Sequence, residues 1–297
     1  MNKNSKRLII EHILSQHAEE SSFLWMLRDG AVSEPHYQLM DLEELETRID
    51  AHLDGLRVAG DAAWRFCEAG LQHKEAGEVF TAVYTALDNS KLDWLDQVLN
   101  TVADTPECTR GIVSALGWSS KEKLQGYVVN WLKSRESMLR MLGLAACAIQ
   151  RVDCGGYLKL GLEDADIIVR ARALRSVGEI RRQDMLPAVV EQLASDDTDC
   201  QFWAAWAATM LGEAKGLRKL QEFYESSNQK FQQYALALGL RAMDKTAAVN
   251  WIREHTMRPG FARPIIEATG IVGDPVTIPW LISLMQKPEY SRLAGES

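Results

Sequence analysis

The sequence predicts an all-α fold, an α-solenoid of about six short helical hairpins that follows an N-terminal helical region. Apolar residues recur with the spacing of an amphipathic helix along nearly the whole chain. No segment gives a convincing alternation of apolar and polar residues, as a half-buried strand would. A unit of about 30 residues also recurs in the second part of the chain, which is typical of a stacked repeat.

The first hundred residues predict an acidic helical region. Apolar positions from Leu8 to Leu27 and from Leu42 to Leu56 each form one helical stripe. Asp41 is the expected N-cap of the second helix, where an acidic side chain favours the helix dipole. Residues 1–104 contain 9 Lys and Arg against 19 Asp and Glu, whereas residues 105–297 contain 24 against 22. This acidity argues against nucleic-acid binding by the first region.

The repeat is marked by an anchor residue near the start of successive helices. The intervals between anchors are 30, 30, 34, 28 and 30 residues, and the anchors are Thr109, Leu139, Val169, Trp203, Phe231 and Phe261. Small residues recur nine positions after several anchors, as at Gly178, Gly212 and Gly270, where a helix can approach its neighbour or end at a glycine cap. Pro187 and Pro279 follow their anchors by 18 residues, which suits the first turn of a second helix.

Two regions follow from these patterns. Residues 1–104 form the acidic N-terminal helical region, and residues 105–297 form the repeat solenoid. A hairpin of two short helices cannot bury both apolar faces alone, so stacking of hairpins supplies the core. The next anchor position is Ser291, so we expect the last repeat to be incomplete. An irregular helical bundle is the alternative.

One unit carries a family resemblance. This unit resembles the short HEAT repeat of the phycobilisome-lyase type. The matching residues are Leu162-Glu163-Asp164, then Val169-Arg170, then Ala173 and Ser176-Val177-Gly178-Glu179-Ile180, with Ser176-Val177 in place of the usual Ala-Leu. Ile271-Val272-Gly273-Asp274-Pro275 resembles the turn of the same repeat. The resemblance implies a HEAT-like solenoid. It implies little about function, because this repeat serves many binding roles.

The first hundred residues carry a second resemblance. They resemble a bacterial family of HEAT-repeat proteins with no established activity. The matching segments are His17-Ala18-Glu19-Glu20, Phe23-Leu24-Trp25, Ala51–Arg57 and Gly77–Phe80. Members are generally longer than this chain, and their genes tend to lie beside genes for type VI secretion effectors. The resemblance implies a genetic context, but no mechanism.

Composition and motifs restrict the function further. The chain is 46% hydrophobic and 25% charged, as a folded soluble protein is, and it has no stretch of about 20 apolar residues for a membrane span. The basic start, residues 1–7, lacks the apolar core of a signal peptide, so we expect a cytoplasmic protein. None of the five cysteines forms a CxxC pair, so we expect reduced thiols.

Catalytic and metal motifs are absent from the sequence. It contains no HExxH, GxxxxGK[ST], GxSxG or GxGxxG after a strand. His12 and His17 are five residues apart and point about 140° apart on a helix, which prevents them from sharing a metal. We therefore expect no enzyme activity, no metal and no cofactor.

An arginine cluster supports one alternative function. Arg170, Arg172, Arg175, Arg181 and Arg182 lie within one helix and its turn, as a basic groove in a helical-repeat lyase or DNA glycosylase-like enzyme would require. Nearby acids and the acidic chain oppose nucleic-acid binding, and in HEAT repeats the matching arginine makes structural contacts. A third hypothesis is that the acidic N-terminal region binds a basic partner, with binding that weakens as salt rises.

The preferred hypothesis is a non-catalytic protein-binding scaffold, such as an adaptor, chaperone or immunity protein for a type VI secretion effector. In HEAT-type hairpins the second helices are expected to line the concave face. The predicted contacts on these helices are Lys121, Gln125, Trp131, Tyr157, Gln192, Lys215, Arg218, Lys219, Glu222, Asn250, Trp251 and Arg253.

Overall fold

The computed structural model describes residues 9–34, 36–225, 229–258 and 260–297, which are helices and connections without a strand. The basic N-terminal residues 1–7 lie outside the described residues. Contacts divide the chain into two compact units, unit 1 (Met1–Trp131) and unit 2 (Leu132–Ser297). The boundary between the two units thus lies at the end of a helical hairpin. The change at residue 104, which rests on charge and repeat pattern, stays a prediction.

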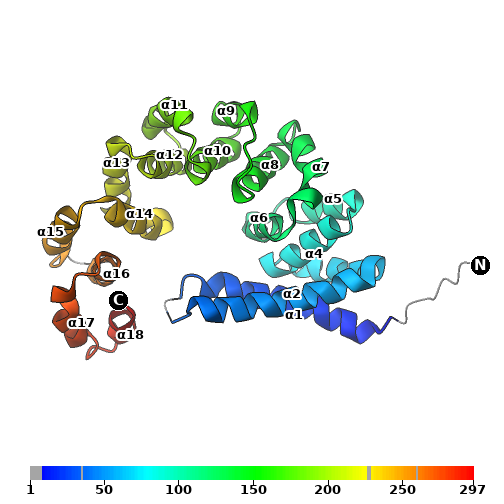
Figure 1. Ribbon diagram of the computed structural model, residues 1–297, viewed down its shortest axis with the longest axis horizontal. Coiled ribbons are helices and arrows are strands. Elements are labelled where there is room, and N and C mark those ends of the chain that lie inside the picture. Colours follow the sequence, from blue (N-terminus) through cyan, green and yellow to red (C-terminus); the bar gives the residue numbers. More distant parts are fainter. Residues whose placement is uncertain (1–8, 35, 226–228, 259) are drawn as a thin grey trace, which may run out of the picture. The chain divides into compact units, whose positions relative to one another are not determined.

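Unit 1 holds the first seven α-helices. They are α1 (Glu11–Ala31), α2 (Leu39–Ala59), α3 (Trp64–Gly70), α4 (Ala76–Asp88), α5 (Leu92–Thr101), α6 (Thr109–Trp118) and α7 (Lys121–Leu132), with 3-10 turns η1 (Gly60–Ala63), η2 (Leu71–His73) and η3 (Pro106–Cys108). The helices α1 and α2 run side by side, and α4 packs against both α1 and α6 (Figure 1).

Unit 2 holds the remaining helices. They are α8 (Ser137–Ile149), α9 (Gly156–Leu162), α10 (Ile167–Ile180), α11 (Leu186–Glu191), α12 (Thr198–Met210), α13 (Ala214–Glu225), α14 (Gln229–Ala242), α15 (Lys245–His255), α16 (Ala262–Val272), α17 (Ile278–Leu284) and α18 (Ser291–Glu296), with η4 (Gln183–Met185), η5 (Gln192–Ala194) and η6 (Pro275–Thr277). In the described residues no helix is long and apolar enough to span a bilayer.

The start of α2 differs from the prediction. The helix begins at Leu39, and its N-cap is Gln38 rather than Asp41. The Asp41 carboxylate accepts a hydrogen bond of 2.8 Å from the Gln38 backbone N–H, which forms half of a capping box. Three more residues are helical than the apolar pattern indicates, because Leu39 and Met40 are exposed and belong to no buried stripe.

The six predicted hairpins are confirmed as α6–α7, α8–α9, α10–α11, α12–α13, α14–α15 and α16–α17. Pro187 and Pro279 occupy the first turns of α11 and α17, as predicted. The anchor Ser291 begins α18, which packs against α16 and α17. The fold is therefore an α-solenoid of HEAT-like hairpins after an N-terminal helical region.

The loops that enter three first helices share one arrangement of side chains. The hydroxyls of Ser134 and Ser195 and the carboxylate of Asp164 each accept from the backbone N–H two residues later, at 3.1, 3.2 and 2.9 Å. Six residues after these positions, Arg140, Arg170 and Gln201 each donate to carbonyls of the same loop. Each side-chain bond fixes the loop at the point where the next helix starts.

Neighbouring repeats are tied together by one of these arginines. Arg140 of α8 donates two hydrogen bonds, of 2.7 and 2.8 Å, to the carboxylate of Asp164 in the loop before α10. Both side chains are largely buried, at 22% and 11% exposure. The Arg140 guanidinium lowers the pKa of Asp164 through these hydrogen bonds. The pair fixes two repeats in register, the structural role expected for a HEAT-repeat arginine.

Unit 2 curves with its first helices on the inner side. Figure 1 shows α8, α10, α12, α14 and α16 along the inside of this curve and α9, α11, α13 and α15 along the outside. The helix α10 packs closely on α8 and α12, whereas neighbouring second helices barely touch. At the α10–α12 contact, a Cβ on Gly178 would lie 3.0 Å from the Cα of Ala207. The prediction that second helices line the concave face is wrong for unit 2, because small residues bring the first helices closest together.

Candidate functional site

On the inner side of unit 2, α10 carries the first side chains of the candidate site. Ala173 turns outward, since a Cβ on Gly161 of α9 would lie 3.0 Å from its methyl group. Arg175 lies two residues further, about 160° around the helix, and therefore points to the inner side. Its guanidinium donates a 2.8 Å hydrogen bond to Glu179, which also accepts from the buried Arg172. One carboxylate thus holds two guanidinium groups on this face.

The next inner helix, α12, adds two indoles. The carbonyl of Ala205 faces Gly216 of α13, at 2.8 Å from a Cβ placed there. Trp203, about 160° away around the helix, therefore points inward. The Arg175 guanidinium lies 4.6 Å from the centroid of the Trp203 ring, within the range of a cation–π contact. Trp206 meets Trp203 edge to face at 5.7 Å, and both are partly exposed.

The helix α14 continues this surface. Gly239 faces Tyr224 of α13, with 2.8 Å between that ring and a Cβ on the glycine. Tyr234 lies about 140° from Gly239 on the helix and is 63% exposed. Lys230, about 180° from Gly239, donates a 2.6 Å hydrogen bond to Asp199 of α12. The inner face of unit 2, defined here by Arg175, Trp203, Trp206 and Tyr234, is aromatic and held by ion pairs.

Four of the five arginines of the cluster are held by neighbouring acids or by backbone carbonyls. Arg172 and Arg175 share Glu179, and Arg182 pairs with Asp184 at 2.8 Å and with Asp153 at 2.6 Å. Arg170 donates to the carbonyls of Asp164 and Ala165, as a structural arginine does. Neighbouring acids therefore offset the charges of Arg172, Arg175 and Arg182, and these three residues give no support to the groove of the alternative enzyme hypothesis.

The structure divides the twelve predicted contacts between the units. Lys121, Gln125 and Trp131 lie on α7 in unit 1. In unit 2, the outer helices α9, α13 and α15 carry Tyr157, Lys215, Arg218, Lys219, Glu222, Asn250, Trp251 and Arg253, and Gln192 lies in η5. Trp131 and Trp251 are only 5% and 6% exposed. These two indoles pack inside their units, because each lies on the apolar stripe of its helix, and they are corrected from surface contacts to interior residues.

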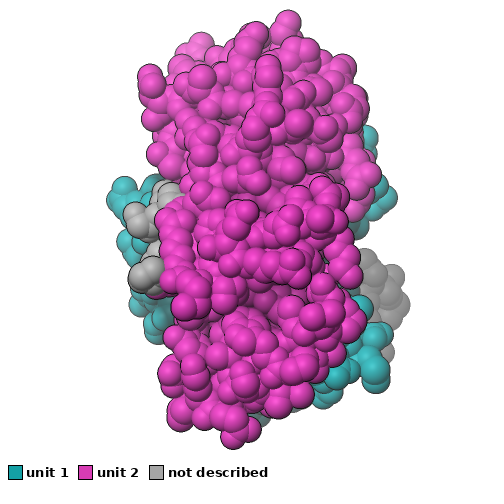
Figure 2. All heavy atoms as spheres, turned by 90° about the vertical axis from the view of Figure 1, so that its left-hand side faces the viewer, with its two compact units in different colours: residues 1–131 teal, residues 132–297 magenta. Residues whose placement is uncertain are grey.

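Three of the predicted residues meet in one groove between α13 and α15. Arg218, Asn250 and the edge of Trp251 line a hollow of about 490 Å³ with Gln221 and Glu254. Figure 2 views unit 2, in magenta, from the side of these helices. The groove is open and its lining mixes charges of both signs, so the structure brings these side chains together without selecting a ligand.

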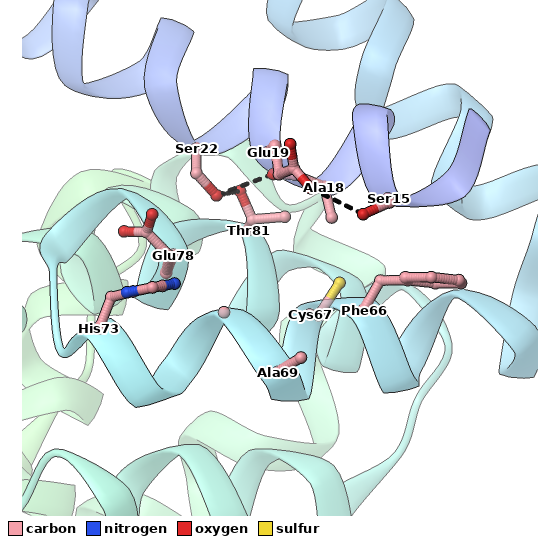
Figure 3. A pocket seen from close by; sticks show the side chains of 11 residues that line it. Ser15, Ala18, Glu19, Ser22, Phe66, Cys67, Ala69, His73, Glu78 and Thr81 are labelled. Atoms are coloured by element: carbon pink, nitrogen blue, oxygen red, sulfur yellow. Dashed lines mark hydrogen bonds between the residues drawn. The ribbon is translucent and has the colours of Figure 1, made fainter. Parts of the chain in front are cut away.

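A polar cavity lies in unit 1, between α1, α3 and α4. It measures about 230 Å³ and is lined by Ser15, Ala18, Glu19, Ser22, Phe66, Cys67, Ala69, Gly70, His73, Glu78 and Thr81. Figure 3 shows Ser15, Glu19 and Ser22 on one wall, Phe66 and Cys67 opposite, and Glu78 beside His73 at one end. Burial raises the pKa of the Cys67 thiol to about 11, so at neutral pH it is not a thiolate nucleophile.

The other reactive side chains of the described residues are cysteines and histidines. All five cysteines are free and buried. In the described part of the chain, no three His, Cys, Asp or Glu side chains are grouped as a metal site would need. The Nδ1 atoms of His17 in α1 and His52 in α2 lie 3.1 Å apart. Burial is the main cause that lowers the pKa of His52, and the neighbouring His17 is the second. This contact between the two imidazole rings joins α1 to α2.

Comparison with known families supports the repeat architecture. Residues 157–241, from α9 to the end of α14, match HEAT repeats. The comparisons with curated proteins and with solved structures gave no match. HEAT-repeat character is therefore shown for the middle of unit 2, which includes the inner-face residues. HEAT repeats commonly form binding scaffolds for other proteins.

The inner face was missed in the sequence, although part of its signal was present. In the sequence, Trp203 is an anchor of the repeat and Arg175 is a member of the arginine cluster. The anchor Trp203 is the largest, because the other repeats have Thr, Leu, Val or Phe at this position. Tyr234 stands where a helix would otherwise carry a polar surface residue, and no pattern in the sequence distinguished it.

Proposed function

We propose that this chain is a non-catalytic scaffold that binds another protein through the inner face of unit 2. The carrying observation is the partly exposed Trp203 ring under the Arg175 guanidinium, on the same side of unit 2 as the 63% exposed Tyr234. Tryptophan, tyrosine and arginine are the residue types that dominate binding hot spots. The ion pairs with Glu179 and Asp199 hold this surface in place before a partner arrives, which lowers the entropic cost of binding.

The finer proposal concerns the partner. The resemblance of the first hundred residues supports a bacterial, cytoplasmic adaptor, chaperone or immunity protein whose partner is a type VI secretion effector. This proposal rests on the resemblance and on the HEAT-repeat match to residues 157–241. The chemistry of the inner face adds that the partner surface should offer apolar groups to Trp203 and Tyr234.

Matched substitutions on the two sides of unit 2 test the proposal. The full chain is purified from cells that carry the neighbouring genes, the retained neighbour product is identified, and its affinity is measured with both proteins purified. We expect Tyr234→Ala and Arg175→Ala to weaken binding about tenfold or more, as loss of a hot-spot residue does. Tyr157→Ala and Arg218→Ala, on the outer side, are controls with the same changes in residue type and should leave affinity within about twofold.

Two outcomes contradict the proposal. Loss of binding with Tyr157→Ala and Arg218→Ala, but not with Tyr234→Ala and Arg175→Ala, would move the contact to the outer side of unit 2. A purified chain that binds none of the products of its neighbouring genes would remove the support for a type VI secretion partner.

A further inference from the structure

The cavity of unit 1 is not part of the proposed scaffold surface, which lies in unit 2. Its volume of about 230 Å³ far exceeds the roughly 15 Å³ of probe-occupied space that a single water needs. It combines an apolar wall, from Ala18, Ala69 and Phe66, with hydroxyls and carboxylates. A cavity with both features fits a small amphipathic ligand better than it fits the packing of three helices.

One end of the cavity holds an unsatisfied carboxylate oxygen. Glu78 lies in the first turn of α4, and its Oε2 atom is buried without a hydrogen-bond partner among the described residues. Burial raises the pKa of this carboxyl group and its own backbone N–H lowers it, while Glu75 raises the pKa and His73 lowers it to a smaller extent. A buried acceptor without a donor costs stability. The Oε2 atom of Glu78 is therefore open to a hydrogen bond from a donor on a ligand.

The hydroxyls on the α1–α4 side of the cavity satisfy one another. The Ser22 hydroxyl lies 2.9 Å from both the carbonyl of Ala18 and the hydroxyl of Thr81, and Ser21 lies 3.0 Å from each of the same two oxygens. Each hydroxyl has one hydrogen and two lone pairs, so this network keeps acceptor capacity. Donors are what the cavity lacks.

We propose that this cavity binds an alkylammonium group, with Glu78 as the counter-ion and the Ser22 and Thr81 hydroxyls as further acceptors. An ammonium group brings three N–H donors and one positive charge. The apolar wall suits the short alkyl chain that carries it. Gly70 keeps the Glu78 end open, because a Cβ at that position would come 3.2 Å from the Glu78 Cγ.

Other ligands fit the lining less well. Calcium and magnesium take six or more oxygen ligands, and the lining has no grouped set of three acidic or metal-binding side chains among the described residues. An anion would face the carboxylates of both Glu19 and Glu78. A quaternary ammonium ion has charge but no N–H donor, so it cannot satisfy the Glu78 Oε2 atom.

Methyl NMR of the full chain tests the site. The protein is labelled with ¹³C at alanine methyl groups, because Ala18 and Ala69 line the cavity, and it is titrated with propylammonium chloride against sodium chloride of equal ionic strength. We expect saturable shifts of these two methyl resonances in the wild-type protein. Glu78→Gln, which keeps the shape of the side chain and removes the charge, should weaken binding tenfold or more.

The matched control is Glu75→Gln. This change removes the same charge from the adjacent N-cap residue of α4, which does not line the cavity and makes no capping hydrogen bond with its side chain. It should bind propylammonium within about twofold of the wild type. Equal binding by Glu78→Gln, or absence of saturable shifts in the wild type, overturns the proposal. Tetramethylammonium binding as strong as that of propylammonium overturns the role of the N–H donors.

The source of the ammonium group is distinguished by competition. A short acetylated and amidated peptide with one lysine is added to the propylammonium complex, beside the same peptide with acetyl-lysine. Displacement by the lysine peptide alone supports an alkylammonium site that accepts a lysine side chain of another protein. If neither peptide displaces propylammonium, the site is restricted to free amines. If both peptides displace it, recognition of the ammonium group is overturned.

The pH dependence gives a second readout. The carboxylate of Glu78 must be ionised to bind a cation, so affinity should fall as pH decreases through its raised pKa. Glu19 on α1, Glu75 at the start of α4 and His73 on η2 are the other charged or titratable groups near this end of the cavity. An affinity unchanged between pH 7 and pH 4, where a carboxyl group with a raised pKa is protonated, contradicts the role of Glu78.

Discussion

The α1–α4 contact of unit 1 and the α10–α12 contact of unit 2 solve the same packing problem with different chemistry. In each, a glycine allows close approach: a Cβ on Gly77 would lie 2.5 Å from the carbonyl oxygen of Ser22, and one on Gly178 would lie 2.5 Å from the Trp206 ring. Around Gly77 the contact contains buried hydroxyls and opens into a cavity. Around Gly178 it contains alanine and indole.

The difference shows where each unit can hold a ligand. At the α10–α12 contact Gly178 lies against Trp206 and Ala207, and the functional groups beside it, Arg175 and Trp203, lie on the surface. The α1–α4 contact keeps a space beside it that is lined by oxygen atoms. Hydroxyls at a helix contact leave acceptor capacity in the interior, whereas alanine and glycine leave none. Polar packing in unit 1 therefore favours an internal site, and apolar packing in unit 2 favours a surface site.

Substitution of the two glycines is expected to change the free energy of unfolding most. Gly77→Ala and Gly178→Ala should each lower the free energy of unfolding by about 1–3 kcal/mol, because the added methyl group forces helices apart. Gly77→Ala should cost more, since a backbone carbonyl cannot rotate away and the edge of an indole can shift. Urea denaturation measures both.

Gly126→Ala is the control for these variants. Gly126 lies on α7, and a Cβ there meets nothing within 4 Å. This substitution should raise the free energy of unfolding by about 0.5–1 kcal/mol, because alanine loses less entropy in a helix. A Gly178→Ala variant as stable as Gly126→Ala would refute the close contact of α10 and α12.

The Arg140–Asp164 pair tests the register between repeats in unit 2. Loss of either partner should cost about 1–3 kcal/mol, because the other is left partly buried without its hydrogen bonds. A double-mutant cycle with Arg140→Ala and Asp164→Ala should give a coupling energy of about 0.5–3 kcal/mol. A coupling energy near zero would mean that the pair does not hold the repeats.

The same pair predicts a dependence on pH. The pKa of Asp164 is lower in the folded protein than its usual value, so the carboxylate contributes stability above about pH 4 and loses it as pH falls through the folded value. Acid unfolding of Asp164→Asn should therefore show a smaller loss of stability between pH 5 and pH 2 than the wild type shows. Equal pH profiles would exclude this contribution.

The hydroxyl network of unit 1 gives the smallest expected effect. Ser22→Ala should cost about 0.5–1.5 kcal/mol, the net value of a typical hydrogen bond. The triple change Ser21→Ala, Ser22→Ala and Thr81→Val should cost less than the sum of the three single changes, because it leaves no hydroxyl without its partner. Thermal unfolding compares these variants, and strict additivity would show that the hydroxyls do not form one network.

Much of the fold could be predicted from the chain alone. The spacing of anchors from Thr109 to Phe261 located six hairpins, and Pro187 and Pro279 marked the first turns of two second helices. These features are local, since helix period, proline position and loop length act within about 30 residues. The start of α2 was misplaced because its first turn is exposed and carries no apolar signal.

The candidate sites were far less accessible to prediction. The helical period gives the side of α15 on which Trp251 lies. Whether that side is buried or exposed depends on the helices packed beside it, which the sequence pattern does not give. Glu78 looked like one of many helix acids, and the cavity beside it exists because α1, α3 and α4 meet across some sixty residues of sequence. No local pattern encodes a space between three helices.

By itself, the sequence determined that this protein is a stack of HEAT-like helical hairpins after an acidic helical region, because amphipathic period and repeat length are properties of short segments. Only the tertiary structure decided which side of unit 2 is the inner one. The direction of its curve depends on the relative spacing of first and second helices, and contacts such as Gly178 with Ala207 set that spacing between residues of different repeats. The same long-range packing placed Trp203 on the inner face and enclosed Glu78 in unit 1.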